Sequence, residues 1–188
     1  MAEAEVRAAT PDEAPVIARL QLSTWRSAYA DLLPPEVLTA LDEAETARQW
    51  SEALTGGAVS VLVAVEGGVP VGFCAAGAAP EQEAAGADGS APPDLAELVL
   101  LSSLLVEPRW GRRGHGGRLL ATMAQQLAAG GATRGICWIP EADSASLSFF
   151  DHAGWGPDGT VRTLDAGGRP VRELRLSGPL DLRMRQPG

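Results

Sequence analysis

Apolar residues recur along this chain with two periods, and segments of the two kinds alternate. Short apolar runs rich in β-branched residues are typical of buried strands, whereas apolar residues three or four positions apart lie on one helix face. The pattern predicts strands at 5–9, 59–65, 69–76, 95–106, 133–139, 155–164 and 170–176. It predicts helices from 11 to at least 25, from 35 or 36, at 45–54, between a glycine-rich bend and 130, and at 143–152. The order β-α-α-β-β-β-α-β-α-β-β indicates an α/β fold.

The stretch at 104–127, LLVEPRWGRRGHGGRLLATMAQQL, joins a strand-like run, a glycine-rich bend and an apolar-periodic helix. The first N–H groups of a helix have no intrahelical partner, and the helix dipole leaves partial positive charge there. Glycines permit positive φ and let a ligand approach the backbone closely. The stretch therefore predicts an anion site, with a phosphate as its guest.

Two common phosphate motifs fit this stretch poorly. A P-loop needs a Lys, and the chain contains none. A dinucleotide fingerprint needs an early βαβ unit with an acid ending the second strand, but Gly114-x-Gly116 lies late and the run at 133–139 has no such acid. A dinucleotide-binding oxidoreductase is thus disfavoured, and a purely structural turn with a solvated Arg cluster is the non-functional alternative.

The same stretch resembles motif A of the GNAT superfamily of N-acetyltransferases. In that motif a strand ending V-x-P leads into [QR]-x-x-G-x-[GA] and a Leu-rich helix. Here residues 106–108 read V-E-P, Gly114 and Gly116 are the two glycines, and Gly111 departs from the Gln/Arg position. The resemblance covers almost the whole chain. It implies a mixed central sheet of about seven strands with a V-shaped splay between two central parallel strands, flanked by about four helices.

The resemblance implies an acetyl-CoA-dependent N-acetyltransferase that transfers the acetyl group directly to a primary amine of a small molecule or peptide. In the family, loop amides hold the pyrophosphate of acetyl-CoA, and the pantetheine arm pairs with the edge of the preceding strand. The implied cofactor-binding residues are Leu104, Leu105, Val106, Gly111, Arg112, Arg113, Gly114, His115, Gly116 and Gly117, together with Asp143, Ser146 and Phe149 on the last helix. For His115, a cofactor-facing or surface position is expected.

The proton-transfer groups are less clear. The usual family acid is the Tyr of an F-Y pair on the last helix, and Phe150 replaces it here. A CoA thiolate can leave without an acid, although water, the substrate, or Ser146 or Ser148 could supply a proton. Candidates for the base are Glu97, unless it is only a solvent residue at the strand start, and Ser102 and Ser103, which could order a water. Glu97 lies three residues too early relative to the glycines unless a bulge restores it. A non-catalytic acyl-CoA-binding sensor is therefore the alternative function.

Trp25 and Tyr29 belong to a segment, W-x-x-A-Y-x-x-x-L-P, that is similar to one in many bacterial GNAT proteins. That segment usually covers the acceptor pocket, so both residues are candidate substrate-binding residues. The alternative is that two aromatic residues four apart on a helix simply pack together. The Pro- and Gly-rich composition of 79–94 predicts a mobile surface loop that borders the same pocket.

Composition and charge narrow the partners further. Residues 1–100 hold 16 acids and 4 Arg, whereas 101–188 hold 8 acids and 11 Arg. Four of these Arg lie at 109–118, which favours a polyanionic cofactor, while nucleic acid would need a wider basic surface. No apolar run is long enough to cross a bilayer, and the first residues carry acids, so no membrane partner and a cytoplasmic location are expected.

The remaining expectations concern organisation and metals. A chain of 188 residues suits one domain, placed here at 1–180, with a flexible tail at 181–188. Cys74 and Cys137 lie in apolar runs and are expected to be reduced core thiols. Neither has a His or Cys neighbour at metal-ligand spacing, so no metal is expected. Homodimers are common in the family, so a homodimer is possible.

Overall fold

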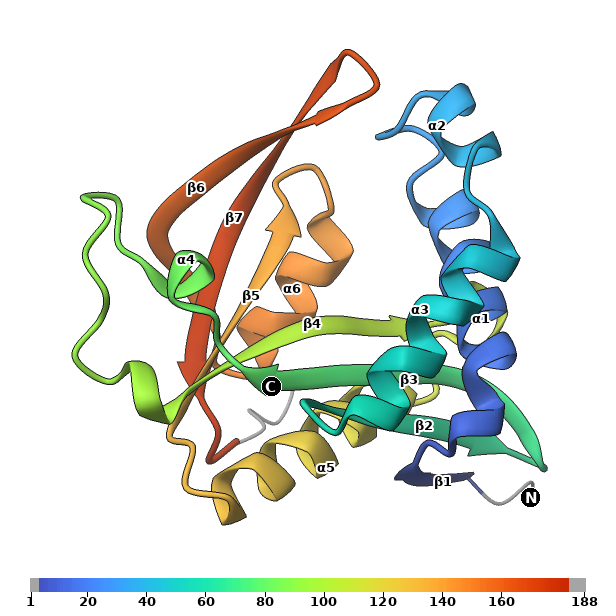
Figure 1. The fold of residues 1–188 in the computed structure, drawn as a ribbon, viewed down its shortest axis with the longest axis horizontal. Helices are drawn as coiled ribbons and strands as arrows, with labels where there is room; N and C mark the ends of the chain where they lie inside the picture. Colours follow the sequence, from blue (N-terminus) through green and yellow to red (C-terminus); the bar gives the residue numbers. More distant parts are fainter. Residues whose placement is uncertain (1–3, 183–188) are drawn as a thin grey trace. The chain divides into compact units, whose positions relative to one another are not determined.

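The computed structural model describes residues 4–182 (Figure 1), and its seven strands follow the predicted order, with one further short helix between the third and fourth strands. The strands are β1 (Ala4–Ala8), β2 (Val59–Glu66), β3 (Val69–Ala78), β4 (Leu98–Val106), β5 (Arg134–Pro140), β6 (Gly156–Ala166) and β7 (Arg169–Pro179). The helices are α1 (Ala14–Ala28), α2 (Pro35–Thr39), α3 (Glu43–Gly56), α4 (Glu81–Ala84), α5 (His115–Ala129) and α6 (Ser144–His152). Short 3-10 turns occupy Pro11–Glu13, Leu95–Glu97 and Pro108–Trp110.

The seven strands are hydrogen-bonded in the order β1-β2-β3-β4-β5-β7-β6. β4 and β5 pair in parallel, whereas β1 with β2, β5 with β7, and β6 with β7 pair antiparallel. The parallel register runs from Leu98↔Arg134 to Leu100↔Ile136, although both strands continue beyond it. Four of the described helices, α1, α3, α5 and α6, have seven residues or more. The predicted α/β class, with a mixed seven-stranded sheet and a parallel central pair, is confirmed.

The chain divides into two compact units. The first unit consists of Met1–Ala76 and Ser103–Met123, and the second of Gly77–Ser102 and Ala124–Gly188. The single domain expected over 1–180 stays a prediction, and most of the tail expected at 181–188 lies outside the described residues.

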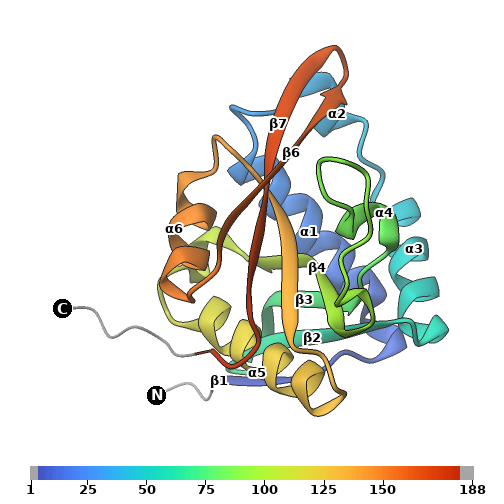
Figure 2. The same cartoon turned by 90° about the vertical axis from the view of Figure 1, so that its left-hand side faces the viewer.

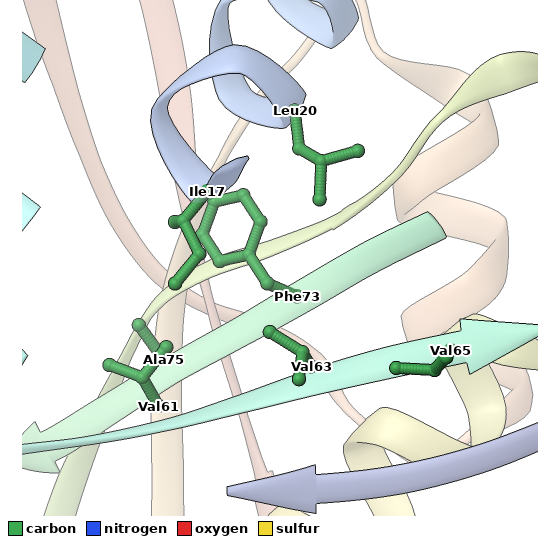
Figure 3. Close-up of a cluster of buried hydrophobic side chains, with 7 residues drawn as sticks. All are labelled: Ile17, Leu20, Val61, Val63, Val65, Phe73 and Ala75. Atoms are coloured by element: carbon green, nitrogen blue, oxygen red, sulfur yellow. The ribbon is translucent and has the colours of Figure 1, made fainter. Parts of the chain in front are cut away.

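In the first unit, α1 covers one face of β2 and β3. Ile17 and Leu20, three apart on α1, meet alternate residues of the two strands (Figure 3). The cluster also contains Val61, Val63, Val65, Phe73 and Ala75. Trp50 of α3 adds its indole, which lies edge-on to the Phe73 ring at 5.2 Å between centroids and donates to Gln21 Oε1 at 2.6 Å.

The first helix begins with a capping contact between Thr10 and Glu13. The Glu13 carboxylate accepts the Thr10 backbone N–H at 2.9 Å. It also accepts both terminal nitrogens of Arg7, at 2.9 and 2.8 Å. The first turn after Thr10 is a 3-10 turn, and regular α-helix begins at Ala14. The entry into α1 is therefore tied to β1 through one carboxylate.

In the second unit, β6 and β7 form a long twisted hairpin (Figure 2). The Trp155 indole, 2% exposed, lies over Gly135 of β5 and Gly178 of β7, which are register partners. Its Nε1–H donates to the Pro179 carbonyl at 3.1 Å, and its ring lies 5.5 Å from that of Phe150. Two facing glycines thus make room for one large aromatic ring.

The segment at 79–94 is more structured than predicted. It contains the short helix α4, and Ala84 is buried in a cluster with Leu98 and Ile136. The Arg175 guanidinium, on β7, donates to the carbonyl oxygens of Glu83 and Ala85 at 2.9 and 2.7 Å. The prediction of an irregular loop was therefore wrong at 81–85, where a side chain about 90 residues away holds the backbone, whereas residues 87–91 are exposed as predicted.

Candidate functional site

The glycine-rich bend of the first unit leads into α5 as predicted. α5 begins at His115, and the Arg118 N–H donates to the Gly114 carbonyl at 3.0 Å. The N–H groups of residues 114–117 precede that bond, so they have no intrahelical acceptor. Gly114 has φ +81°, and a Cβ there would lie 3.1 Å from Arg118 Nη1. Both facts favour glycine at this position.

Arg112 is the one described non-glycine residue with positive φ, at 61°. It is exposed, as are Gly111, Arg113 and Gly114. A left-handed backbone is strained for Arg, and such strain often marks a functional turn. The loop therefore presents free amides and basic side chains on one exposed turn.

The strand ahead of the loop is fixed closely against β3. The Glu107 N–H donates to the Val71 carbonyl at 2.9 Å. At Gly72 an added Cβ would lie only 2.6 Å from the Leu105 carbonyl oxygen and 3.1 Å from Val106 Cα. The half-buried residues 104–106 thus depend on a glycine that the sequence pattern did not single out.

A charged network lies behind the loop. Glu66, at the end of β2, accepts Arg113 Nη1 at 3.1 Å and meets His115 Nε2 at 2.6 Å. His115 Nδ1 lies 3.1 Å from Arg118 Nη2. Partial burial opposes ionisation of Glu66, but the His115 hydrogen bond and the Arg113 charge outweigh it and lower the pKa of this carboxyl.

The imidazole of His115 is buried, with the residue only 1% exposed. The expectation of a surface position was therefore wrong for its side chain, whereas a position facing the cofactor stays a prediction. The His115 backbone N–H is one of the four at the helix start that have no intrahelical acceptor. Glu66, which holds the ring, was missed because it lies 49 residues earlier and no local pattern links the two.

Comparison with known proteins identifies this arrangement. The model of the acetyltransferase (GNAT) family matches residues 22–155. The chain belongs to the GNAT acetyltransferase family. Its enzyme class is accordingly that of the N-acetyltransferases.

Several proteins are similar to this GNAT chain over most of its length. A probable N-acetyltransferase of Mycobacterium tuberculosis is 25% identical over 162 residues, which are 84% of this chain and 83% of the relative. The ribosomal-protein-alanine N-acetyltransferase from Brucella melitensis has a TM-score of 0.71 at 20% identity, covering 93% of this chain and 99% of that one. The yncA protein from Salmonella typhimurium, solved with acetyl-CoA, has a TM-score of 0.70 at 17% identity and covers 98% of both chains.

In the second unit, the GNAT candidates on α6 are engaged with one another. Asp143 accepts the Ser146 backbone N–H at 3.0 Å and its hydroxyl at 2.7 Å, so it caps the helix. Phe149 is half-buried, and Phe150 is 3% exposed between the Phe149 and Trp155 rings. The Ser146 hydroxyl donates within its own cap, which disfavours it as an acid, and Phe150 has no proton to donate.

The candidate base Glu97 lies on the 3-10 turn that precedes β4. Its exposed carboxylate accepts the Thr133 hydroxyl at 3.0 Å. The register of β4 against β5 is regular from Leu98 to Leu100, so no bulge there shifts the position of Glu97 along the strand. This geometry favours the solvent role over the catalytic one. Ser102 is exposed in the second unit, and Ser103 is half-buried in the first.

The candidate acceptor residues contact each other. The rings of Trp25 and Tyr29 are 6.3 Å apart and tilted by 46°, and both are half-buried. Their mutual contact agrees with the packing alternative, and both residues stay partly exposed.

Residues 4–182 contain neither a cluster of metal ligands nor a membrane-spanning helix. Within that range, no three His, Cys, Asp or Glu side chains are grouped as metal ligands would be. No helix in the same range has the length and apolar character to span a bilayer. Cys74 and Cys137 are free and buried, and burial raises the pKa of both thiols.

Proposed function

We propose that this GNAT protein transfers the acetyl group of acetyl-CoA directly to a primary amine of a small molecule or peptide. The observation that carries the proposal is the turn at 111–117, which is exposed at 111–114, and where the amides at the start of α5 have no intrahelical acceptor and follow Arg112 and Arg113. Such a turn suits a diphosphate, because the helix dipole and fixed N–H groups both favour negative charge. The acetyl-CoA in the Salmonella relative supports the same cofactor.

In this proposal the amides of 114–117 hold the pyrophosphate, and Gly111, Arg112 and Arg113 complete the turn around it. The backbone of Leu104, Leu105 and Val106 pairs with the pantetheine arm as an added strand would. Asp143, Ser146 and Phe149, at the start of α6 in the second unit, stay proposed cofactor-binding residues on the family resemblance alone. Backbone groups supply most of these contacts, which explains why Gly111 can replace the usual Gln or Arg.

The reaction needs few side chains as proton donors or acceptors. A neutral amine attacks the thioester carbonyl, the C–S bond breaks, and the CoA thiolate leaves as the amine nitrogen gives up its proton. A water ordered by Ser102 or Ser103 can receive that proton. Because a thiol has a pKa of about 8.5, its thiolate can leave unprotonated at neutral pH. Phe150 is therefore compatible with turnover.

Calorimetry with acetyl-CoA and with NAD tests the cofactor, and only acetyl-CoA is expected to bind. Gly114→Glu is expected to abolish that binding, because it puts a side chain and a negative charge at the turn. Gly89→Glu is the matched control, since Gly89 has nearly the same φ, +80°, and open space around it. Binding of NAD alone, or unchanged acetyl-CoA affinity in Gly114→Glu, would refute the cofactor site.

A second function, a non-catalytic acyl-CoA sensor, is favoured by Phe150 and by the engagement of Glu97 with Thr133. Thiol release measured across a panel of amines distinguishes the two. Turnover of any amine supports the enzyme, whereas tight binding with no release across a broad panel supports the sensor.

The acceptor contacts and the assembly state need separate tests. If Trp25 and Tyr29 contact the acceptor, Trp25→Ala raises the KM for the amine and leaves acetyl-CoA affinity unchanged. A loss of stability with unchanged KM would instead show that the two rings only pack. Light scattering measures whether the chain forms the homodimer that is common among GNAT proteins.

A further inference from the structure

The buried His115 ring is bonded at both nitrogens, and the bonds fix its protonation state. An Arg guanidinium can only donate, so Arg118 Nη2, 3.1 Å away, requires an unprotonated Nδ1. Nε2 then carries the hydrogen and donates to the Glu66 carboxylate at 2.6 Å. The ring is therefore neutral, with its hydrogen on Nε2. It links the Glu66 carboxylate to the Arg118 guanidinium.

The same contacts fix the backbone of the turn. Arg118 Nη2 also donates to the Arg113 carbonyl oxygen at 3.1 Å. The Arg113 guanidinium carbon lies 4.8 Å from the centre of the Trp110 ring, and its Nη1 donates to Glu66. The Glu66 carboxylate of β2 and the His115 imidazole of α5 thus hold both ends of the turn at 110–118.

This arrangement also sets the charge near the turn. Arg113 and Arg118 would repel each other and any protonated ring between them, and the Glu66 carboxylate offsets one of the two positive charges. The contacts of Glu66 with Arg113 and His115, and of Arg118 with the Arg113 carbonyl, hold this backbone in one arrangement.

We propose that Glu66 and His115 are positioning residues for the diphosphate of the cofactor, a role that rests on the proposed function. Neither side chain touches the cofactor. They hold the His115 and Gly116 amides in the direction that the diphosphate requires, so their loss weakens cofactor binding and leaves the chemical step unchanged.

Two substitutions separate the two bonds. His115→Gln puts an amide N–H near the position of Nε2, which keeps the donor for Glu66 and removes the acceptor for Arg118. His115→Asn puts an amide oxygen near the position of Nδ1, which keeps the acceptor for Arg118 and removes the donor for Glu66. Each is expected to raise the Kd for CoA about tenfold, because a misplaced contact group of this kind costs one to two orders of magnitude.

The readouts distinguish positioning from general stability. Calorimetry with CoA, dephospho-CoA and pantetheine is expected to show equal losses for the first two ligands and none for pantetheine, which has no diphosphate. With any amine that is turned over, KM for acetyl-CoA rises and kcat does not change. Phe73→Leu, in the core of the same unit, lowers stability and leaves CoA affinity unchanged.

Matched controls exist for both residues. His152→Gln changes the other His of the chain, which is exposed on α6, and is expected to bind CoA as the wild type does. Glu66→Gln is expected to weaken CoA binding, whereas Glu52→Gln, which removes an exposed acid paired with Arg48, is not. If His115→Gln fails to fold, the CoA affinity of Glu66→Gln still tests whether the contact between Glu66 and His115 supports cofactor binding.

Imidazole ¹⁵N spectra of His-labelled protein test the ring directly, with His152→Gln used for assignment. The expected result at neutral pH is an unprotonated Nδ1 and a protonated Nε2 on His115. The inference is overturned by a charged ring, by the other tautomer, or by substitutions at 66 and 115 that bind CoA as tightly as the wild type. A wild-type protein that binds no CoA would instead refute the proposed function.

Discussion

Gly135→Ala tests the packing of the second unit most directly, because the methyl group has no free space to enter. A Cβ built at Gly135 would lie 2.7 Å from Cζ2 and 3.3 Å from Cζ3 of Trp155, and closer still to Cη2. These are atoms at the far end of a buried indole. Its near end is confined by Gly178, where an added Cβ would lie 2.7 Å from Nε1. The ring therefore cannot accommodate the methyl by tilting toward β7.

The magnitude follows from opposing contributions. A buried methyl contributes about 0.8 kcal/mol, and replacing Gly in a strand about 0.5–1 kcal/mol more. Overpacking costs about 1–3 kcal/mol. Displacing the indole also weakens its hydrogen bond to the Pro179 carbonyl and its contact with Phe150, each about 0.5–1.5 kcal/mol. We expect Gly135→Ala to lower the free energy of unfolding by about 2 kcal/mol.

Urea unfolding followed by fluorescence and circular dichroism measures this loss. Gly156→Ala is the control, because nothing lies within 4 Å of a Cβ there, and its effect is expected to stay within about 0.5 kcal/mol. Trp155→Phe removes the distal ring atoms, so the double variant Gly135→Ala/Trp155→Phe should lose about 1 kcal/mol less than the sum of the two single losses. A Gly135→Ala protein as stable as the wild type, or strictly additive losses, would refute the reasoning.

Three further outcomes are expected. Hydrogen bonds from Arg7 lower the pKa of Glu13 from 4.5 to about 2, so its stabilisation is present above about pH 4.5 and is lost as the pH falls toward 2. Because Arg7 is partly exposed, Glu13→Gln should cost only about 1–2 kcal/mol at pH 7, and urea titrations should show this difference shrinking below pH 4.5. The two buried cysteines should react with a thiol reagent at pH 8 only when the protein opens, so fast labelling of the native state would contradict their burial. Gly72→Ala should displace the Leu105 backbone and weaken CoA binding about tenfold by calorimetry, while Gly56→Ala, with open space around it, should have no effect on binding.

The sequence predicted those parts of the fold that local patterns determine. The start of α5 directly after Gly114 follows from the change of apolar period at the glycines, and the Thr10 to Glu13 cap follows from residue types three apart. The α6 cap at Asp143 is of the same local kind. In each case the residues that make the contact are neighbours in the chain.

Contacts between distant segments could not be predicted in the same way. The roles of Gly72, Gly135 and Gly178 depend on a carbonyl or an indole from another element, and glycine in a strand gives no sign of which atom approaches it. The segment at 79–94 has a loop-like composition, and Arg175, about 90 residues later, accounts for two of the contacts that hold its backbone. Side chains that reach across the fold decide such details.

The turn at 110–118 depends on both kinds of information. Its glycines and its Arg residues are visible in the sequence, and they suffice to predict an anion site. A turn with so many positive charges would, however, spread apart without an anion bound, since the charges repel one another across an exposed loop. The Glu66 carboxylate, at the end of β2, offsets that repulsion. It is linked to the start of α5 by its hydrogen bond with the neutral His115 ring. Preorganisation before the ligand arrives lowers the ordering cost of binding. The affinity of this GNAT protein for its cofactor should therefore depend on Glu66, which lies 49 residues before His115 and holds its ring.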